Sequence, residues 1–385
     1  MPNTLHDWFC LKPGRDSFKP SVVRDRELVF CHEDKIDNEI MMSIEKCFAA
    51  RRPVKMVLYG DWGVGKTHTV YHIAWWFEHH HDFPAQTVLV ELGDITGKSK
   101  FDVLIGPFLD RIGLNELIRL VAAYGAASGK HVLEGLKECG SANNVAEAFG
   151  KFLLASPGST PPPAVQTAFE FLKGEKPKDA ASIGLGAPLD QSEEFYSVLL
   201  CCGELCRKVN KRQLIFMADE AAKLDDLEGD DATRQHWVAV NRMIFDDVNN
   251  VFGFIYTLSG KGQKNIPSVI SDSQIVNRLG SNNIIELPNL APTDVETFLE
   301  KLKVSFVDQT QVDALAANGE VGDKDYWKSY PFTAQGLQEF IDYWNRNQED
   351  AKPRDICDKL DDVGFRAMKD SKRLIDPECL KKARM

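Results

Sequence analysis

Neither a membrane-spanning segment nor a secretion signal is found in this sequence of 385 residues. No run of about eighteen uncharged apolar residues occurs, and a helix needs roughly that length to cross a bilayer. The first residues also lack the basic-then-apolar pattern that marks a signal peptide. We therefore expect a cytoplasmic protein that makes no membrane contact.

Acidic residues outnumber basic residues. The chain has 46 Lys and Arg against 57 Asp and Glu, which gives a net charge of −11. This balance excludes a surface that is basic throughout, so a contact with nucleic acid would need a local positive patch. One such stretch is residues 366–385, with seven Lys and Arg against three Asp and Glu. Basic residues near a chain end also commonly serve solubility alone.

The sequence also lacks clusters of metal-ligating residues at the spacing that a metal site requires. The nine cysteines of a chain expected in a reducing compartment predict free thiols. Only Cys201, Cys202 and Cys206 cluster, and without further ligands at zinc spacing they are better interpreted as core residues of a helix. The triplet at 79–81 is three histidines, but consecutive helix residues point in different directions and cannot converge on one ion.

A phosphate-binding loop is present. Residues 60–67 fit G-x-x-x-x-G-K-[ST] and lie between an apolar run at 54–59 and a helical pattern at 68–77. Glycines there let backbone N–H groups surround phosphates at the positive end of the helix. Lys66 should reach the β- and γ-phosphate oxygens, and the Thr67 hydroxyl should hold Mg²⁺. The alternative is a chance glycine turn. The predicted ATP-binding residues of the loop are Gly60, Asp61, Trp62, Gly63, Val64, Gly65, Lys66 and Thr67.

Apolar segments and helical periodicity predict an α/β fold with a parallel five-stranded P-loop NTPase sheet. Strands are expected at residues 54–59, 86–92, 214–218, 251–258 and 284–287. Helices are expected at 36–48, 68–77, 101–124, 131–138, 144–154, 164–172, 193–209, 293–307, 333–345, 353–369 and 377–383. This order predicts an N-terminal arm with the first helix (1–50), a nucleotide-binding domain (51–290) with a helical insertion at about 94–210, and a helical lid domain (291–385).

Two carboxylates follow the third apolar strand. Asp219 and Glu220 come directly after residues 214–218, at the strand end where the sites of parallel sheets gather. Asp219 is expected to bind Mg²⁺ through water, and Glu220 to polarise the attacking water. The alternative is an acidic loop after a buried strand.

Together these features resemble an AAA+ ATPase of the origin-recognition and replication-licensing type. The resemblance implies that the segment at 22–28, with Arg24, leads the chain over the adenine, and that His68 joins the nucleotide-binding set. It places Ser259 or Thr257 at the polar sensor-1 position. Residues 275–279 resemble the box that carries the arginine finger, here Arg278, and residues 352–356 resemble the sensor-2 segment, here with Arg354.

The resemblance is incomplete in two ways. We expect no winged-helix DNA-binding domain after the lid, and the helical insertion is an addition. The insertion, with residues 169–175 and the glycine-rich loop after them, is similar to bacterial ATPases of BREX-like anti-phage defence. Transposition-regulating ATPases likewise lack a winged helix and assemble on DNA.

The predicted arginine finger implies self-assembly. A cation that stabilises the charge of phosphoryl transfer accelerates hydrolysis by roughly 10³ to 10⁵, and a neighbouring subunit can supply it. Arg242 is the alternative finger, and a surface salt bridge is the alternative role for Arg278. Arg354 could instead pair with Asp355 or Asp358 at a helix start.

Three functions remain open from the sequence. The first is an ATP-hydrolysing switch that forms a ring or spiral, engages DNA, and recruits an effector such as a nuclease or transposase in genome defence or mobile-element control. The second is a nucleotide-gated protein scaffold that never touches DNA, which the acidic balance favours. The third, a small-molecule kinase, leaves the two arginines and the lid unexplained.

Overall fold

A computed structural model describes residues 4–93, 103–226, 231–246, 251–260, 273–321 and 326–385. Contacts divide the chain into two compact units. We call residues 34–60 and 69–286 the sheet unit, and residues 1–33, 61–68 and 287–385 the helical unit. The domain boundaries near residues 50 and 290 stay a prediction from the sequence.

The sheet unit is built on a parallel five-stranded sheet in the order β2-β3-β4-β1-β5. Every residue of β1 and β3 is buried, and their residues are mainly apolar, with Lys55, Gln213 and Asp219 at the strand ends as the charged or amide-bearing exceptions. Gly60 aligns with Ser259, and Glu91 aligns with Asp219, so the predicted site residues of these strands lie at one edge of the sheet. The predicted fold class is confirmed. The strands are Lys55–Gly60 (β1), Ala85–Glu91 (β2), Gln213–Asp219 (β3), Phe252–Ser259 (β4) and Ile284–Glu286 (β5).

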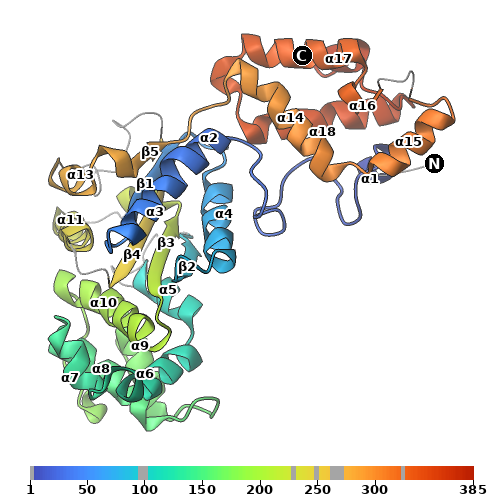
Figure 1. Cartoon of the computed structure of the whole chain (residues 1–385). Coiled ribbons are helices and arrows are strands. Elements are labelled where there is room, and N and C mark those ends of the chain that lie inside the picture. The colour runs from blue at the N-terminus through green and yellow to red at the C-terminus, as the bar shows by residue number, and fades with distance from the viewer. Residues whose placement is uncertain (1–3, 94–102, 227–230, 247–250, 261–272, 322–325) are drawn as a thin grey trace. The chain divides into compact units, whose positions relative to one another are not determined.

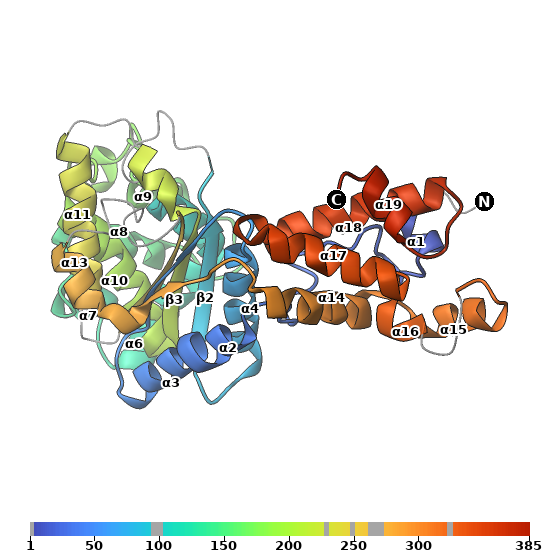
Figure 2. The same cartoon turned by 90° about the horizontal axis from the view of Figure 1, so that it is seen from above.

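Helices cover both faces of this sheet. In Figure 2, α4 lies on one side of the strands and α10 and α11 on the other. α4 connects β1 to β2, whereas α10 and α11 belong to connections that run back across the sheet, so right-handed crossovers place them on opposite faces. α10 packs against β3 and β4, and α5 against β2. The helices around the strands are α2 (Glu33–Lys35), a π-helical turn (Ile36–Met41), α3 (Met42–Ala49), α4 (Lys66–His79), α10 (Ser192–Val209), α11 (Asp231–Asp246) and α13 (Ser273–Leu279).

The predicted insertion is helical. Figure 1 shows α6, α7, α8 and α9 gathered at one end of the sheet unit, and their buried side chains continue the hydrophobic core of the sheet. One expectation here was wrong: the single helix predicted from residue 101 to 124 is divided at Gly113, whose φ of 87° a helix cannot include. The helices are α5 (Ile105–Ile112), α6 (Leu114–Ser128), α7 (Val132–Glu138), α8 (Asn143–Gly150) and α9 (Pro163–Leu172).

The helical unit joins the two ends of the chain. The apolar side chains of Leu5, Phe9 and Phe18 lie in one core with those of the C-terminal helices, and Leu11 forms a β-bridge with Val307. Its helices are α1 (Leu5–Trp8), α14 (Pro292–Phe306), α15 (Gln309–Ala317), α16 (Tyr326–Ser329), α17 (Ala334–Arg346), α18 (Pro353–Lys369) and α19 (Pro377–Lys382). Among the helices of the described residues, none combines the length and the apolar character that crossing a bilayer takes.

Candidate functional site

The phosphate-binding motif forms a tight loop between β1 and α4. Gly63 and Gly65 have φ values of 86° and 102°, a region that side chains other than glycine rarely adopt. The loop closes on itself, because the Lys66 amine donates to the Asp61 carbonyl at 2.8 Å. α4 starts at Lys66, so the N-terminal end of a helix follows the loop directly. These features are those of a phosphate-binding loop.

The first turn of α18 contacts this loop within the helical unit. Lys352 forms an ion pair with Asp61 at 2.9 Å, and this hydrogen bond raises the pKa of Lys352 above its ordinary value. The Arg354 guanidinium carbon lies 3.8 Å from the centre of the Trp62 ring. The Arg354 backbone N–H donates to the Gly63 carbonyl at 3.3 Å. The structure therefore brings Arg354 to the loop, and it adds Lys352, which the sequence analysis did not place in the site.

The segment before α2 also lies against the loop and the start of α4. His32 Nε2 is 3.0 Å from the Val64 carbonyl oxygen, and His68 Nε2 is 2.8 Å from that of Leu28. His68 thus holds the N-terminal segment, whereas His32 carried no motif that would have identified it. Arg24 is exposed and donates to the Gly14 carbonyl.

A second group of polar side chains lies in the sheet unit, at the ends of β3 and β4. Asp219 and Thr257 are almost fully buried, and the Thr257 hydroxyl donates to the Asp219 carboxylate. The same hydroxyl accepts the backbone N–H of Glu220 at 3.0 Å. Ser259 lies two residues further along β4, beside Gly60. Of the two candidates for the sensor-1 position, Thr257 is the one that contacts the acidic pair.

Glu220 has an unusual backbone. Its φ of 58° lies in the left-handed region, which costs a residue other than glycine about 1–2 kcal/mol. The hydrogen bond from its N–H to Thr257 helps to hold this conformation. Its carboxylate is one-third exposed and pairs with Lys223. Strain of this kind is concentrated at functional sites, so it agrees with a catalytic role for this residue.

The two candidate arginine fingers lie on neighbouring helices of the sheet unit. Arg278, on α13, donates to Asp246 at the end of α11 and is one-third exposed. Arg242 lies on α11, one position beyond the buried Asn241. The surface ion pair that was one alternative for Arg278 is thus formed within this chain.

The donor set suits Mg²⁺. The Thr67 hydroxyl and the Asp219 carboxylate are hard oxygen donors, which this ion prefers. The described part of the chain contains no group of three or more His, Cys, Asp or Glu side chains placed to hold a metal ion. Mg²⁺ typically takes one or two protein ligands and completes its shell with water and substrate phosphates. Thr67 belongs to the helical unit and Asp219 to the sheet unit, and each by itself is of the kind that magnesium takes when it arrives with a nucleotide.

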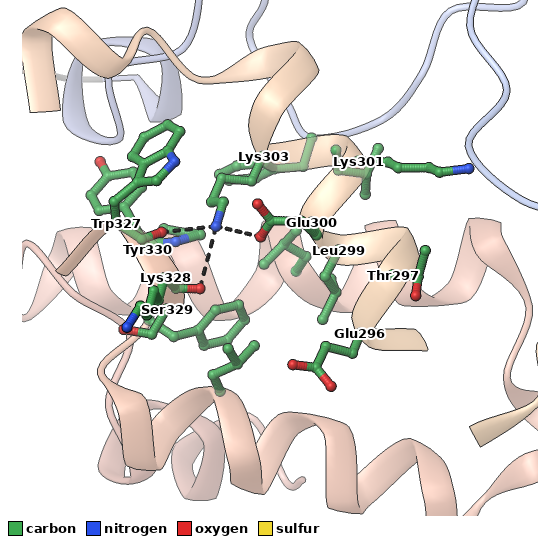
Figure 3. A pocket seen from close by; sticks show the side chains of 16 residues that line it. Glu296, Thr297, Leu299, Glu300, Lys301, Lys303, Trp327, Lys328, Ser329 and Tyr330 are labelled. Atoms are coloured by element: carbon green, nitrogen blue, oxygen red, sulfur yellow. Dashed lines mark hydrogen bonds and ion pairs between the residues drawn. The ribbon is translucent and has the colours of Figure 1, made fainter. Parts of the chain in front are cut away.

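A pocket of about 710 Å³ lies elsewhere in the helical unit, between α14, α16 and α18. Figure 3 shows that the Lys303 amine contacts the Glu300 carboxylate and the carbonyls of Trp327 and Lys328, the last two at 2.8 and 3.3 Å. These acceptors already use the charge and the donors of this buried lysine, so it is not set up to hold a phosphate. None of the predicted site residues lines the pocket.

The fold is that of the AAA+ ATPases of the Cdc6 and ORC type. The chain is similar to Cdc6p from Pyrobaculum aerophilum, with a TM-score of 0.51 and 11% identity over 95% of this chain and 69% of the other. It is also similar to the ADP form of the ORC2 protein from Aeropyrum pernix, with a TM-score of 0.54 and 12% identity over 97% and 72%. No protein-family model and no curated protein matches the sequence.

Proposed function

We propose that this chain is an ATP-hydrolysing AAA+ switch. The observation that supports it most is the loop of residues 61–67, with two glycines at positive φ, Lys66 at the start of a helix, and Arg354 held on the loop. The Aeropyrum pernix ORC2 protein, which shares this fold, has been solved in an ADP form and with ADPNP and ADP. A nucleotide is therefore the ligand that both the loop and the fold favour.

Each predicted residue has a role in this proposal. The backbone of residues 60–65 and the Lys66 amine bind the phosphates, with His68 and Arg24 on the side of the base and sugar. Thr67 and, through water, Asp219 would hold Mg²⁺, which would neutralise phosphate charge when bound. Glu220 orients the attacking water, and Thr257 or Ser259 fixes its position. Arg354 contacts the γ-phosphate, and Arg278 of a neighbouring copy completes the site.

The hydrolysis assignment is tested by comparing the parent chain with Lys66→Ala and Glu220→Gln. Lys66→Ala should lose ATP binding, whereas Glu220→Gln should keep ATP and lose hydrolysis by about 10² to 10⁴. Phosphate release and equilibrium ATP binding are the measurements. Glu91→Gln is the matched control, because Glu91 is an exposed carboxylate at the end of the neighbouring strand β2. Hydrolysis by Glu220→Gln at the parent rate would show that the water-activating role is misassigned.

In the wider proposal the switch self-assembles on DNA and recruits an effector in genome defence or mobile-element control. The second candidate, a scaffold that binds a protein and not DNA, is favoured by the net charge of −11. Titration of duplex DNA at several salt concentrations, with and without ATP, separates the two. An electrostatic DNA contact strengthens steeply as salt falls. If no binding occurs even at low salt in either state, the scaffold is the better description.

A further inference from the structure

The guanidinium of Arg354 packs over an aromatic ring, and this contact does not use its N–H groups. Its guanidinium carbon lies 3.8 Å from the centroid of the Trp62 ring, a stacking distance. Among the described residues, no hydrogen bond from its guanidinium N–H groups to a protein acceptor occurs, and the residue is exposed. A guanidinium binds phosphate through the N–H groups in its plane, and stacking does not use them. Arg354 therefore has both its position fixed and its donors available.

The backbone and the Cβ atom of Arg354 are held in place as well. The Arg354 N–H donates to the Gly63 carbonyl at 3.3 Å, and a Cβ added to Gly63 would lie only 3.2 Å from the Arg354 Cβ. Two residues earlier, Lys352 pairs with Asp61, whose second carboxylate oxygen accepts the Trp62 N–H at 2.8 Å. Asp61 and Gly63, on either side of Trp62, are thus both attached to the first turn of α18.

Trp62 is itself an unusual residue for an exposed loop. Its side chain is 60% exposed, although tryptophan usually buries most of its surface. Because both neighbours of Trp62 are tied to α18, the ring keeps its place over the arginine without being buried. The ring contacts the Arg354 guanidinium.

We propose that Trp62 is a positioning residue that orients the Arg354 guanidinium for the γ-phosphate, and so sets the preference of the site for ATP over ADP. This inference rests on the proposed function, since it needs a nucleotide on the loop. The arginine loses less conformational freedom on binding because the ring already restricts it. An exposed cation–π contact corresponds to a factor of about two to five in a binding constant.

The test is a set of four chains: parent, Trp62→Ala, Arg354→Ala and the double variant. Dissociation constants for ATP and ADP are measured for each by calorimetry. Trp62→Ala should weaken ATP binding about two- to fivefold while changing ADP binding much less. Trp62→Phe, which keeps an aromatic ring, should bind ATP almost as tightly as the parent. In the Arg354→Ala background the same substitution should leave the ATP-to-ADP ratio unchanged, since the ring then has nothing to orient.

Phe365→Ala is the matched control, because Phe365 is an exposed aromatic residue on the same helix and should leave the ratio as it is. The outcomes separate the two proposals. A parent chain that binds neither nucleotide overturns the proposed function and this inference with it. The inference alone is overturned if the parent binds ATP and Trp62→Ala has the same ratio of ATP to ADP dissociation constants as the parent. It is likewise overturned if Trp62→Ala binds ATP more tightly than the parent does.

Discussion

The Thr257 hydroxyl satisfies two groups at once, a buried carboxylate and a main-chain N–H in a strained conformation. Asp219 is almost fully buried, and buried polar groups need hydrogen-bond partners, one of which the Thr257 hydroxyl supplies. The Thr257 side chain therefore holds both members of the acidic pair in place. This is why we favour Thr257 over Ser259 as the polar residue closest to the reaction.

Asp361 is a residue whose charge opposes folding. It lies on α18 and accepts the Phe18 N–H at 2.8 Å, and its burial raises its pKa to about 6. An unfolded aspartate titrates near 3.9. The folded state thus holds this proton more tightly, so the stabilising contribution is complete below about pH 4 and is lost as the pH rises through 6.

We predict that Asp361→Asn stabilises the protein at pH 8, by about 1–2 kcal/mol after allowance for partial solvent screening. Asparagine cannot ionise, and its side-chain oxygen can still accept from Phe18. The stabilisation caused by Asp361→Asn should become smaller as the pH falls towards 5. Urea unfolding at pH 5, 6.5 and 8 measures it, with the exposed neighbour Asp362→Asn as the control. Equal stability of parent and variant at pH 8 would contradict the argument.

At the scale of elements, β4 depends on a glycine. A Cβ on Gly253 would lie 2.8 Å from the Val54 carbonyl oxygen, just before β1, and 3.2 Å from a side-chain carbon of Ile215 on β3. The strands on both sides of β4 are therefore close to this one residue. Neither neighbouring atom is the end of a long flexible side chain, so little relaxation is available.

We predict that Gly253→Ala destabilises the protein by about 1–3 kcal/mol through overpacking. The measurement is urea unfolding followed by far-ultraviolet circular dichroism. Gly186→Ala provides the control, because nothing lies within 4 Å of the added carbon there and the change should be small. If the urea midpoint of Gly253→Ala equalled that of the parent, β4 would have moved to accommodate the added methyl group without a measurable loss of stability.

Elements with strong local signals were predictable from the sequence. The five strands were, because each contains a run of mainly apolar residues that the sheet buries. α18 was predicted with its observed bounds, because a proline such as Pro353 is favoured in the first turn of a helix. α15 was missed because it buries little, with Val312 as its one buried residue. Its start was nevertheless encoded, since Asp308 caps the N–H groups of Thr310 and Gln311.

The site was predictable in part for the same reason. The phosphate loop and the acidic pair are short motifs, so their residues could be named from local sequence alone. The contacts of Lys352 with Asp61 and of Arg354 with Trp62 join residues far apart in the chain, and no local pattern specifies such a pairing. The same holds for His32, whose contact with the Val64 carbonyl depends on how the N-terminal segment returns to the loop.

At the scale of the whole molecule, the proposal requires more than one copy. Arg278 is engaged with Asp246 through an exposed pair, which is typically worth no more than about 1 kcal/mol. Exchanging that carboxylate for a phosphate of a neighbouring copy is therefore energetically accessible. An arginine supplied in this way can account for most of the hydrolysis rate.

We predict that Arg278→Ala keeps ATP binding and loses hydrolysis by about 10³ or more. Mixing it with Lys66→Ala should recover activity, because the second variant supplies an intact arginine to the intact loop of the first. Phosphate release measured against mixing ratio is the readout, and Arg242→Ala serves as the comparison. If Arg278→Ala hydrolysed ATP at the parent rate while Arg242→Ala did not, the assignment would pass to Arg242.

The return of the N-terminal segment to the C-terminal helices has a consequence for biosynthesis. The Trp8 indole donates to the Lys372 carbonyl, 364 residues further along, so its partner leaves the ribosome long after it does. At about 5–20 residues per second, the apolar side chains of residues 5–30 wait tens of seconds for their core. The sheet unit has been synthesised by then. The helical unit should accordingly be the later of the two units to fold, and residues 5–30 should need protection until it does.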